Sequence, residues 1–147
     1  MRKRGLLGAS VRIKVPFYDV DSLNVAWHGH YAKYMEEARC ALLELVDYDY
    51  GAMQAEGYAW PVVDLHIRYA QPALFGQELT ARAELIEWET RLVLNYLISD
   101  ARTGTRLTRA TTTQVAVHIA TRETQLVSPP GLIRAVRTAL AREEAAQ

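Results

Sequence analysis

The feature that most constrains this chain is one long amphipathic helix followed by strands with no second long helix among them. From Gly29 onward, apolar side chains recur with the helical period and charged side chains fill the other side. The pattern predicts a helix of about four to five turns that must bury its apolar stripe. That stripe comprises Tyr31, Tyr34, Met35, Ala38, Leu42 and Leu45, and the polar side comprises Lys33, Glu36, Glu37, Arg39 and Glu44.

The rest of the chain alternates with the period of strands. Residues 10–20 precede the helix as a half-buried strand, with Val11, Ile13 and Val15 on one side. A short helix or turn follows at 47–57 and ends at Gly57. Four long strands are predicted at 58–73, 77–90, 91–101 and 106–120, with a hairpin turn centred on Gly104, and a closing helix follows two prolines, at about 130–142.

This order predicts an α+β fold in one domain over residues 1–147, with its core at about 11–120. Because no helices separate the later strands, the sheet of about five strands should be mostly antiparallel. A strongly curved sheet wrapped around the long central helix buries the helix stripe. One such protomer leaves a sheet edge uncovered, so we expect a homodimer or a tetramer.

Composition excludes several classes of function. Basic and acidic residues balance at 17 each, which gives no support for a nucleic-acid partner. The first residues contain Arg and Lys, but the apolar run after them is short and broken by glycine, so we expect neither a signal peptide nor a membrane span. The single cysteine, Cys40, rules out an intrachain disulfide and suits a cytoplasmic location. We expect Cys40 to serve packing.

The segment from Phe17 to Tyr31 holds two aspartates and two histidines. If the first strand continues, Asp19 and Asp21 point the same way, either as solvated loop carboxylates or as catalytic groups. His28 and His30 form an H-x-H pair, but on a helix beginning at Gly29 the two imidazoles do not share a face. We therefore expect no metal site and no cofactor. No familiar nucleophile or phosphate-binding motif is present.

The predicted helix start gives this segment a chemical use. The first N–H groups of a helix lack partners within it and carry the positive end of its dipole. Gly29 would let a ligand approach these amides closely. A carbonyl oxygen placed there would be polarised, and a carboxylate just upstream could attack the carbonyl or activate a water molecule. These groups are sufficient for acyl transfer.

At this point the sequence resembles a known family. The stretch "FYDVDSLNVAWHGHYAKYMEEAR" and the later "RYAQPALFGQELTARAEL" are similar to the 4-hydroxybenzoyl-CoA thioesterase type of the hotdog-fold superfamily. The similarity covers about residues 11–120. It implies a hotdog fold and hydrolysis of an acyl thioester, carried by coenzyme A or by an acyl carrier protein, to a free acid and a thiol.

The resemblance also implies residue roles. Asp21 matches the family's catalytic aspartate, as nucleophile or as general base, and His28 matches a histidine that orients substrate or water. Gly29, His30 and Tyr31 lie where helix amides polarise the thioester carbonyl. Asp19 and the His30 side chain are assigned to structure. Phe17 stands where some members have a tyrosine, which argues against a tyrosine hydroxyl in the mechanism.

More distant assignments complete the prediction. Arg91 begins a strand near where relatives contact the nucleotide end of coenzyme A. The segments around "VDSLNVAWHGHY" and "YAWPVVDL" also resemble thioesterase-like proteins of aryl-polyene and xanthomonadin pigment clusters, which implies an aryl or polyene acyl group. Two alternatives stay open: a hotdog dehydratase, and a non-catalytic subunit that binds acyl thioesters. The spacing of Asp21 and His28 favours the thioesterase.

Overall fold

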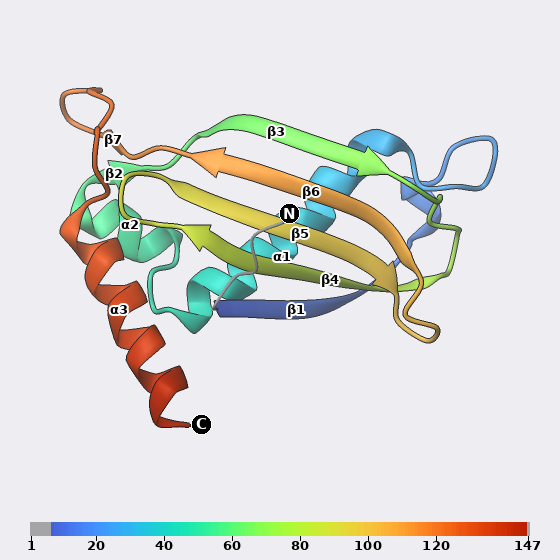
Figure 1. Ribbon diagram of the computed structural model, residues 1–147. Helices are drawn as coiled ribbons and strands as arrows, with labels where there is room; N and C mark the ends of the chain where they lie inside the picture. Colours follow the sequence, from blue (N-terminus) through green and yellow to red (C-terminus); the bar gives the residue numbers. More distant parts are fainter. Residues whose placement is uncertain (1–6, 147) are drawn as a thin grey trace.

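The computed structural model describes residues 7–146 and places a five-stranded sheet in front of one long helix (Figure 1). In spatial order the strands are β1 (Leu7–Lys14), β4 (Glu78–Glu87), β5 (Leu92–Asp100), β6 (Arg106–Gln114) and β3 (Val62–Tyr69). Every neighbouring pair is antiparallel. The predicted α+β class, with a helix against a mostly antiparallel sheet, is confirmed.

Within residues 7–146, the long helix of this unit is α1 (Tyr31–Leu45), and two further α-helices and a second small sheet accompany it. A 3-10 turn at His28–His30 leads into α1. Helix α2 (Tyr50–Glu56) begins where the Asp49 carboxylate accepts the Ala52 N–H at 2.9 Å. Helix α3 (Pro130–Ala145) extends three residues beyond its predicted end and runs from one end of the sheet (Figure 1). Strands β2 (Tyr58–Ala59) and β7 (Val117–His118) pair with each other.

The core lies between α1 and the inner face of the sheet. Helix α1 packs on β1, β4 and β5, where small side chains on β4 let the helix approach. Strand β5 contributes larger side chains to the same layer. Buried core positions on these strands include Leu79, Ala81, Ala83, Leu85, Leu94, Tyr96 and Ile98.

The buried side of α1 differs from the predicted stripe at three positions, one of which is Leu43, buried although the stripe did not include it. Leu45 is 45% exposed, whereas Arg39, assigned to the polar side, is only 3% exposed. The Arg39 guanidinium donates to the hydroxyls of Tyr50 and Tyr96 at 2.9 and 3.2 Å and pairs with Glu36. These interactions replace the hydrogen bonds to water that the guanidinium loses on burial. The prediction that Arg39 lies on the polar side of the helix was therefore wrong.

Three predicted strands were too long. The first strand ends at Lys14, because Pro16 lacks a donor for the sheet and a 3-10 turn follows at Phe17–Asp19. The region 58–73 divides into β2 and β3 around Trp60 and Pro61. The region 106–120 divides into β6 and β7, because β7 leaves the main sheet to pair with β2.

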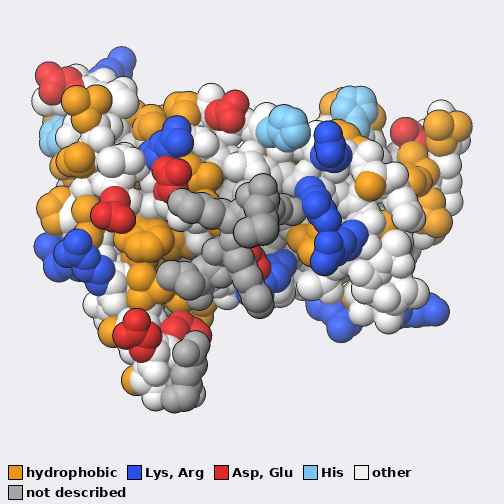
Figure 2. All heavy atoms as spheres, viewed as in Figure 1, with side chains coloured by type: hydrophobic (Ala, Val, Ile, Leu, Met, Phe, Trp, Pro, Cys, Tyr) orange, Lys and Arg blue, Asp and Glu red, His pale blue; other side chains and the backbone are white. Residues whose placement is uncertain are grey.

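Strand β3 is the exposed edge of the sheet, as the prediction of an uncovered edge requires. Seven of its eight residues are exposed and the eighth, Ile67, is half-buried. Figure 2 views the sheet from the face opposite α1, where Lys and Arg side chains lie beside acidic ones. Within residues 7–146, no helix combines the length and the apolar character needed to cross a membrane.

Candidate active site

The loop after the 3-10 turn presents Asp21 to solvent. Val20 bridges to Ala26, and the Asp21 N–H donates to the Val25 carbonyl at 3.0 Å. Asn24 adopts φ of 63°, which closes the turn between them. Asp21 Oδ1 accepts the Leu23 N–H at 2.8 Å. The loop thus holds the backbone of an exposed carboxylate in place, while within residues 7–146 Oδ2 accepts no hydrogen bond.

Asp19, two residues earlier, is buried and fully engaged. Its carboxylate accepts from Lys33 Nζ at 2.6 Å and from the Tyr34 hydroxyl at 2.7 Å. His30 Nδ1 lies 3.8 Å from the same carboxylate. Burial alone would raise the pKa of Asp19, but the bonds from Lys33 and Tyr34 outweigh it and lower that pKa. The two carboxylates therefore do not point the same way, because the strand that would have aligned them ends at Lys14.

The start of the helix is shielded by Trp27. Its indole ring lies against the Cα of Gly29, where any Cβ would overlap the ring atoms. The ring also contacts the imidazoles of His28 and His30, with centroid separations of 4.9 and 5.4 Å. Gly29 is thus required for the packing of Trp27, a role that we did not predict.

Only some of the predicted amides remain available at this helix start. The His30 N–H donates to the Trp27 carbonyl at 2.9 Å. The first turn of a 3-10 helix leaves its earliest N–H groups without helical partners, which points to His28 and Gly29. The predicted contribution of the His30 amide therefore conflicts with the bond that it already makes.

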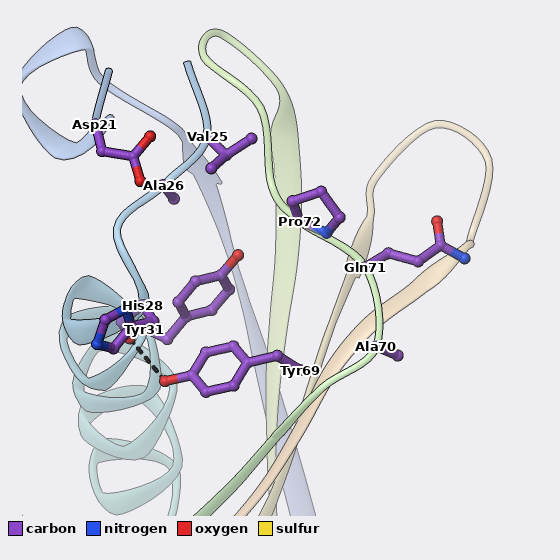
Figure 3. Close-up of a pocket in the computed structure, with 9 residues that line it drawn as sticks. All are labelled: Asp21, Val25, Ala26, His28, Tyr31, Tyr69, Ala70, Gln71 and Pro72. Atoms are coloured by element: carbon purple, nitrogen blue, oxygen red, sulfur yellow. Dashed lines mark hydrogen bonds between the residues drawn. The ribbon is translucent and has the colours of Figure 1, made fainter. Parts of the chain in front are cut away.

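A pocket of about 290 Å³ joins the Asp21 loop to the helix start (Figure 3). The Tyr31 and Tyr69 rings meet edge to face, 5.1 Å between centroids, at its centre. The Tyr31 hydroxyl accepts the Ala73 N–H at 3.0 Å, and the Tyr69 hydroxyl donates to the His28 carbonyl at 2.7 Å. The lining residues are Asp21, Val25, Ala26, His28, Tyr31, Tyr69, Ala70, Gln71 and Pro72.

The structure brings three of the predicted site residues together, since Asp21, His28 and Tyr31 line one pocket. Arg91 does not join them within one chain. Ile98 of β5, Thr108 of β6 and Tyr69 of β3 are neighbours across the sheet, and Arg91 lies at the opposite end of β5, roughly 20 Å away. Its guanidinium pairs with Glu87 at 3.1 Å. Arg91 stays a prediction for the nucleotide end of a ligand.

Tyr69 and the segment after it were not predicted as parts of the site. Tyr69 looked like one more apolar position of an alternating strand. The usable signal was the stretch "AQP" directly after Tyr69, within the second segment that carries the family resemblance, because its residues Ala70, Gln71 and Pro72 line the pocket. Burial and the neighbouring Tyr31 raise the pKa of Tyr69, which keeps its hydroxyl a neutral donor to His28.

The residues described carry no alternative reactive centre of a familiar kind. Residues 7–146 contain no group of three or more His, Cys, Asp or Glu side chains placed to hold a metal ion. Cys40 is half-buried on α1, and burial raises the pKa of its thiol. Trp60 is buried, and its ring meets the Tyr48 ring edge to face.

Comparison with protein families decides where this fold and pocket belong. The family model described as the thioesterase-like superfamily matches residues 15–140. The chain belongs to this superfamily. The matched region contains the whole candidate pocket and four of the five strands of the main sheet.

Solved structures of other proteins share the fold. A hypothetical protein, TT1821, from Thermus thermophilus is 29% identical with a TM-score of 0.80, over 89% of this chain and 98% of that one. The 1,4-dihydroxy-2-naphthoyl-CoA thioesterase Slr0204 of Synechocystis is 22% identical with a TM-score of 0.78, over 91% and 96% of the two chains. At that identity the similarity shows the hotdog fold alone.

Two curated relatives match over shorter regions. YneP of Bacillus subtilis, provisionally named an acyl-CoA thioesterase, is 32% identical over 65 residues, which cover 44% of this chain and 47% of YneP. A Synechocystis protein, sll0410, provisionally named an esterase, is 27% identical over 90 residues, covering 56% and 54%. The chain thus spans about half the length of the curated relatives that it matches.

Proposed function

We propose that the protein hydrolyses acyl-CoA thioesters in the pocket between the Asp21 loop and the start of α1. One observation carries the proposal: an exposed carboxylate and the amide end of a helix line the same hollow of about 290 Å³. Membership of the thioesterase-like superfamily supports this chemistry, as does the name of YneP.

The proposed reaction places the thioester carbonyl at the helix start. The N–H groups of His28 and Gly29 polarise the carbonyl oxygen and stabilise the oxyanion that forms on attack. Asp21 then acts in one of two ways. As a general base it takes a proton from water while the water oxygen bonds to the carbonyl carbon. As a nucleophile its carboxylate bonds to that carbon, giving a mixed anhydride that water hydrolyses. In both, the C–S bond breaks and the thiol leaves.

His28 and Tyr69 have supporting roles in this proposal. The His28 side chain lines the same pocket as Asp21 and orients water or the thioester. Tyr69 fixes the His28 carbonyl from β3, which holds the first turn of the helix against the sheet. The His30 side chain acts in structure, through its contact with buried Asp19.

For the acyl group we propose an aryl or polyene chain. The exposed Tyr69 ring, backed edge to face by the buried Tyr31 ring, presents aromatic surface to the pocket, and flat unsaturated groups pack well on such a ring. This agrees with the resemblance to pigment-cluster thioesterases. An acyl carrier protein stays the alternative carrier. We also infer a single domain over 1–147, a cytoplasmic location, and a homo-oligomer that covers the exposed β3 edge.

The test is the substitution Asp21→Asn, assayed by thiol release from a panel of acyl-CoA and acyl-carrier-protein thioesters. We expect kcat/KM to fall by about a hundredfold or more, because the amide can neither attack nor accept the proton. The melting temperature should stay unchanged, since the amide oxygen still accepts the Leu23 N–H. Wild-type turnover in this variant would remove Asp21 from the mechanism. If the wild-type protein released no thiol, the result would favour a non-catalytic binding subunit. If it hydrated enoyl thioesters, the result would favour a dehydratase.

A further inference from the structure

Two arginines face each other on the outer side of the sheet, the side away from α1. Arg68 of β3 and Arg109 of β6 are directly opposite in the antiparallel ladder, and both are exposed. The Cα atoms of such a pair lie about 5 Å apart, so the two side chains share one patch of surface. Like charges placed directly opposite each other destabilise a sheet. The pair is therefore unfavourable for the fold unless an opposite charge lies between the two guanidinium groups.

The surrounding strands supply no such charge. Across the sheet from Arg109, the neighbour on β5 is the apolar Leu97. The one carboxylate of β3, Asp64, is four residues from Arg68, so their Cα atoms lie roughly 13 Å apart. Within residues 7–146, neither arginine of the pair forms an ion pair. The positive charge at this place is thus unbalanced in the described chain.

The two arginines border an open cleft of about 320 Å³ on this face. The lining residues are His66, Arg68, Arg109, Ala110 and Thr111. The Thr111 hydroxyl donates to Asn95 Oδ1 at 2.8 Å, so its proton is already used. The hydrogen-bond donors left at the cleft are two guanidinium groups and the His66 imidazole, and its described lining contains no carboxylate. In Figure 2, Lys and Arg side chains gather on this face over β3 and β6.

We propose that this cleft is an anion site that binds a terminal phosphate group, with the phosphate oxygens between the guanidinium groups of Arg68 and Arg109. A guanidinium donates two parallel N–H bonds to phosphate oxygens and keeps its charge at every physiological pH. A terminal phosphate carries close to two negative charges at pH 7, which balances both arginines. A phosphodiester carries one charge and balances half of the pair. The ligand class is therefore a phosphate monoester or inorganic phosphate.

The phosphate cleft and the candidate pocket lie on opposite faces of one strand. Arg68 and Tyr69 are consecutive, so their side chains point to opposite faces of β3, and Tyr69 lines the pocket. Two sources of a terminal phosphate are compatible with this placement. One is the 3′-phosphate of coenzyme A, passing round the end of β3 from a thioester in the pocket, and this source rests on the proposed function. The other is a separate phosphate-bearing ligand, which binds whether or not the pocket is filled.

Thermal melting tests the site through two opposite effects of one substitution. In chloride buffer, Arg109→Gln should raise the melting temperature by up to about 4 °C, because the like-charge contact is removed. At matched ionic strength, saturating inorganic phosphate should raise the melting temperature of the wild type by several degrees and leave that of Arg109→Gln unchanged. A variant that merely damaged the fold would lower the melting temperature in both buffers.

Isothermal titration with inorganic phosphate measures the binding directly. Arg68→Gln and Arg109→Gln should each raise Kd by about tenfold to a hundredfold, which is the range for losing hydrogen bonds to a charged group. Arg82→Gln is the matched control, because Arg82 is exposed on the same face but pairs with Glu84 at 3.3 Å. This control should bind phosphate like the wild type. An equal loss in Arg82→Gln, or no saturable binding by the wild type, would overturn the proposal.

A pair of substrates identifies the source of the phosphate. The activity of wild type and Arg109→Gln is compared on an acyl-CoA and on the same acyl group carried by pantetheine, which has no phosphate. A rise in KM for acyl-CoA alone identifies the 3′-phosphate of the substrate as the ligand. Equal KM values on both substrates, together with weakened phosphate binding, identify a separate ligand. Phosphate binding is measured without any thioester, so failure of the proposed reaction and failure of the site give different outcomes.

An acidic surface of another protein chain is the competing occupant of the arginine pair. In that case Arg68→Gln and Arg109→Gln would weaken self-association in sedimentation equilibrium, and phosphate would show no saturable binding to the wild type. This combination would assign the two arginines to a protein interface and reject the phosphate site. With a phosphate site, both variants should sediment like the wild type.

Discussion

Asp19 and Asp21 are two residues apart and differ in almost every physical respect. Asp19 is 2% exposed and accepts from Lys33 and Tyr34, which join the loop to α1. Asp21 is exposed and accepts one backbone N–H from its own loop. A buried carboxylate with both oxygens engaged stabilises structure, whereas an exposed one that lines a pocket can act on a ligand. The first aspartate, in effect, holds the second in place.

The sharpest way to break this comparison is to neutralise each aspartate in turn. Asp21→Asn should remove activity and leave stability unchanged. The primary effect of Asp19→Asn should be a loss of stability. Loss of the buried carboxylate leaves Lys33 and Tyr34 without their acceptor, at a cost of about 1–3 kcal/mol in the free energy of unfolding. Urea denaturation at pH 7 measures that cost. Equal stability of Asp19→Asn and wild type would contradict the structural role.

The same pair predicts a pH dependence. The folded pKa of Asp19 is lowered from 3.8, so its contribution to stability is complete well above pH 3.8. That contribution is lost as the pH falls through the lower folded value. The stability difference between wild type and Asp19→Asn should therefore shrink below about pH 3.8. Denaturation curves at pH 7, 4 and 3 follow it, and a difference that grows on acidification would contradict the assignment.

The sequence was sufficient for the main helix and strands, and its failures have physical causes. Asp21 lines the pocket, and its catalytic role stays a prediction. Periodicity located α1 because one face of the helix is buried along most of its length. Periodicity wrongly placed Arg39 on the polar side of the helix. The charge can be buried because the guanidinium donates hydrogen bonds to the hydroxyls of Tyr50 and Tyr96, which are distant in sequence. No local pattern contains that information.

At the site, too, local features could be predicted from the sequence and contacts between distant segments could not. Asp21 and His28 were found because motif and helix start lie in one segment. Tyr69 was missed because it reaches the pocket through the strand order, which places β3 at the sheet edge beside the helix start. Asp19 and Asp21 were expected to share a direction, and the 3-10 turn after Pro16 separated them. Local features are readable in the sequence, whereas contacts between distant segments require the fold.

A second way to sharpen the comparison acts on the helix start, not on a carboxylate. Gly29→Ala would place a Cβ inside the Trp27 ring, which must move. We expect activity to fall by about tenfold, since a small displacement of positioned groups has effects of this order or larger. Trp27→Ala combined with Gly29→Ala should recover part of the loss by making space for the new methyl group.

The matched control for this substitution is Gly51→Ala. Gly51 also lies near a helix start, and a Cβ there would meet only Asp49 Oδ1 at an ordinary 3.5 Å. Alanine should be neutral or stabilise the helix by up to about 1 kcal/mol. If Gly51→Ala reduced activity as strongly as Gly29→Ala, the loss would reflect a general effect of alanine in helices, and the Trp27 contact would carry no weight.

The smallest expected effect concerns Tyr69→Phe, which removes one hydroxyl and keeps the ring. The His28 carbonyl loses a donor at 2.7 Å, while the edge contact with Tyr31 stays. Because Tyr69 is 45% exposed, water can replace the lost donor, and stability should change by no more than about 1 kcal/mol. The helix start would be held less firmly, so kcat should fall by about twofold to tenfold with little change in KM. A rise in KM at constant kcat would instead show that the hydroxyl binds the substrate directly.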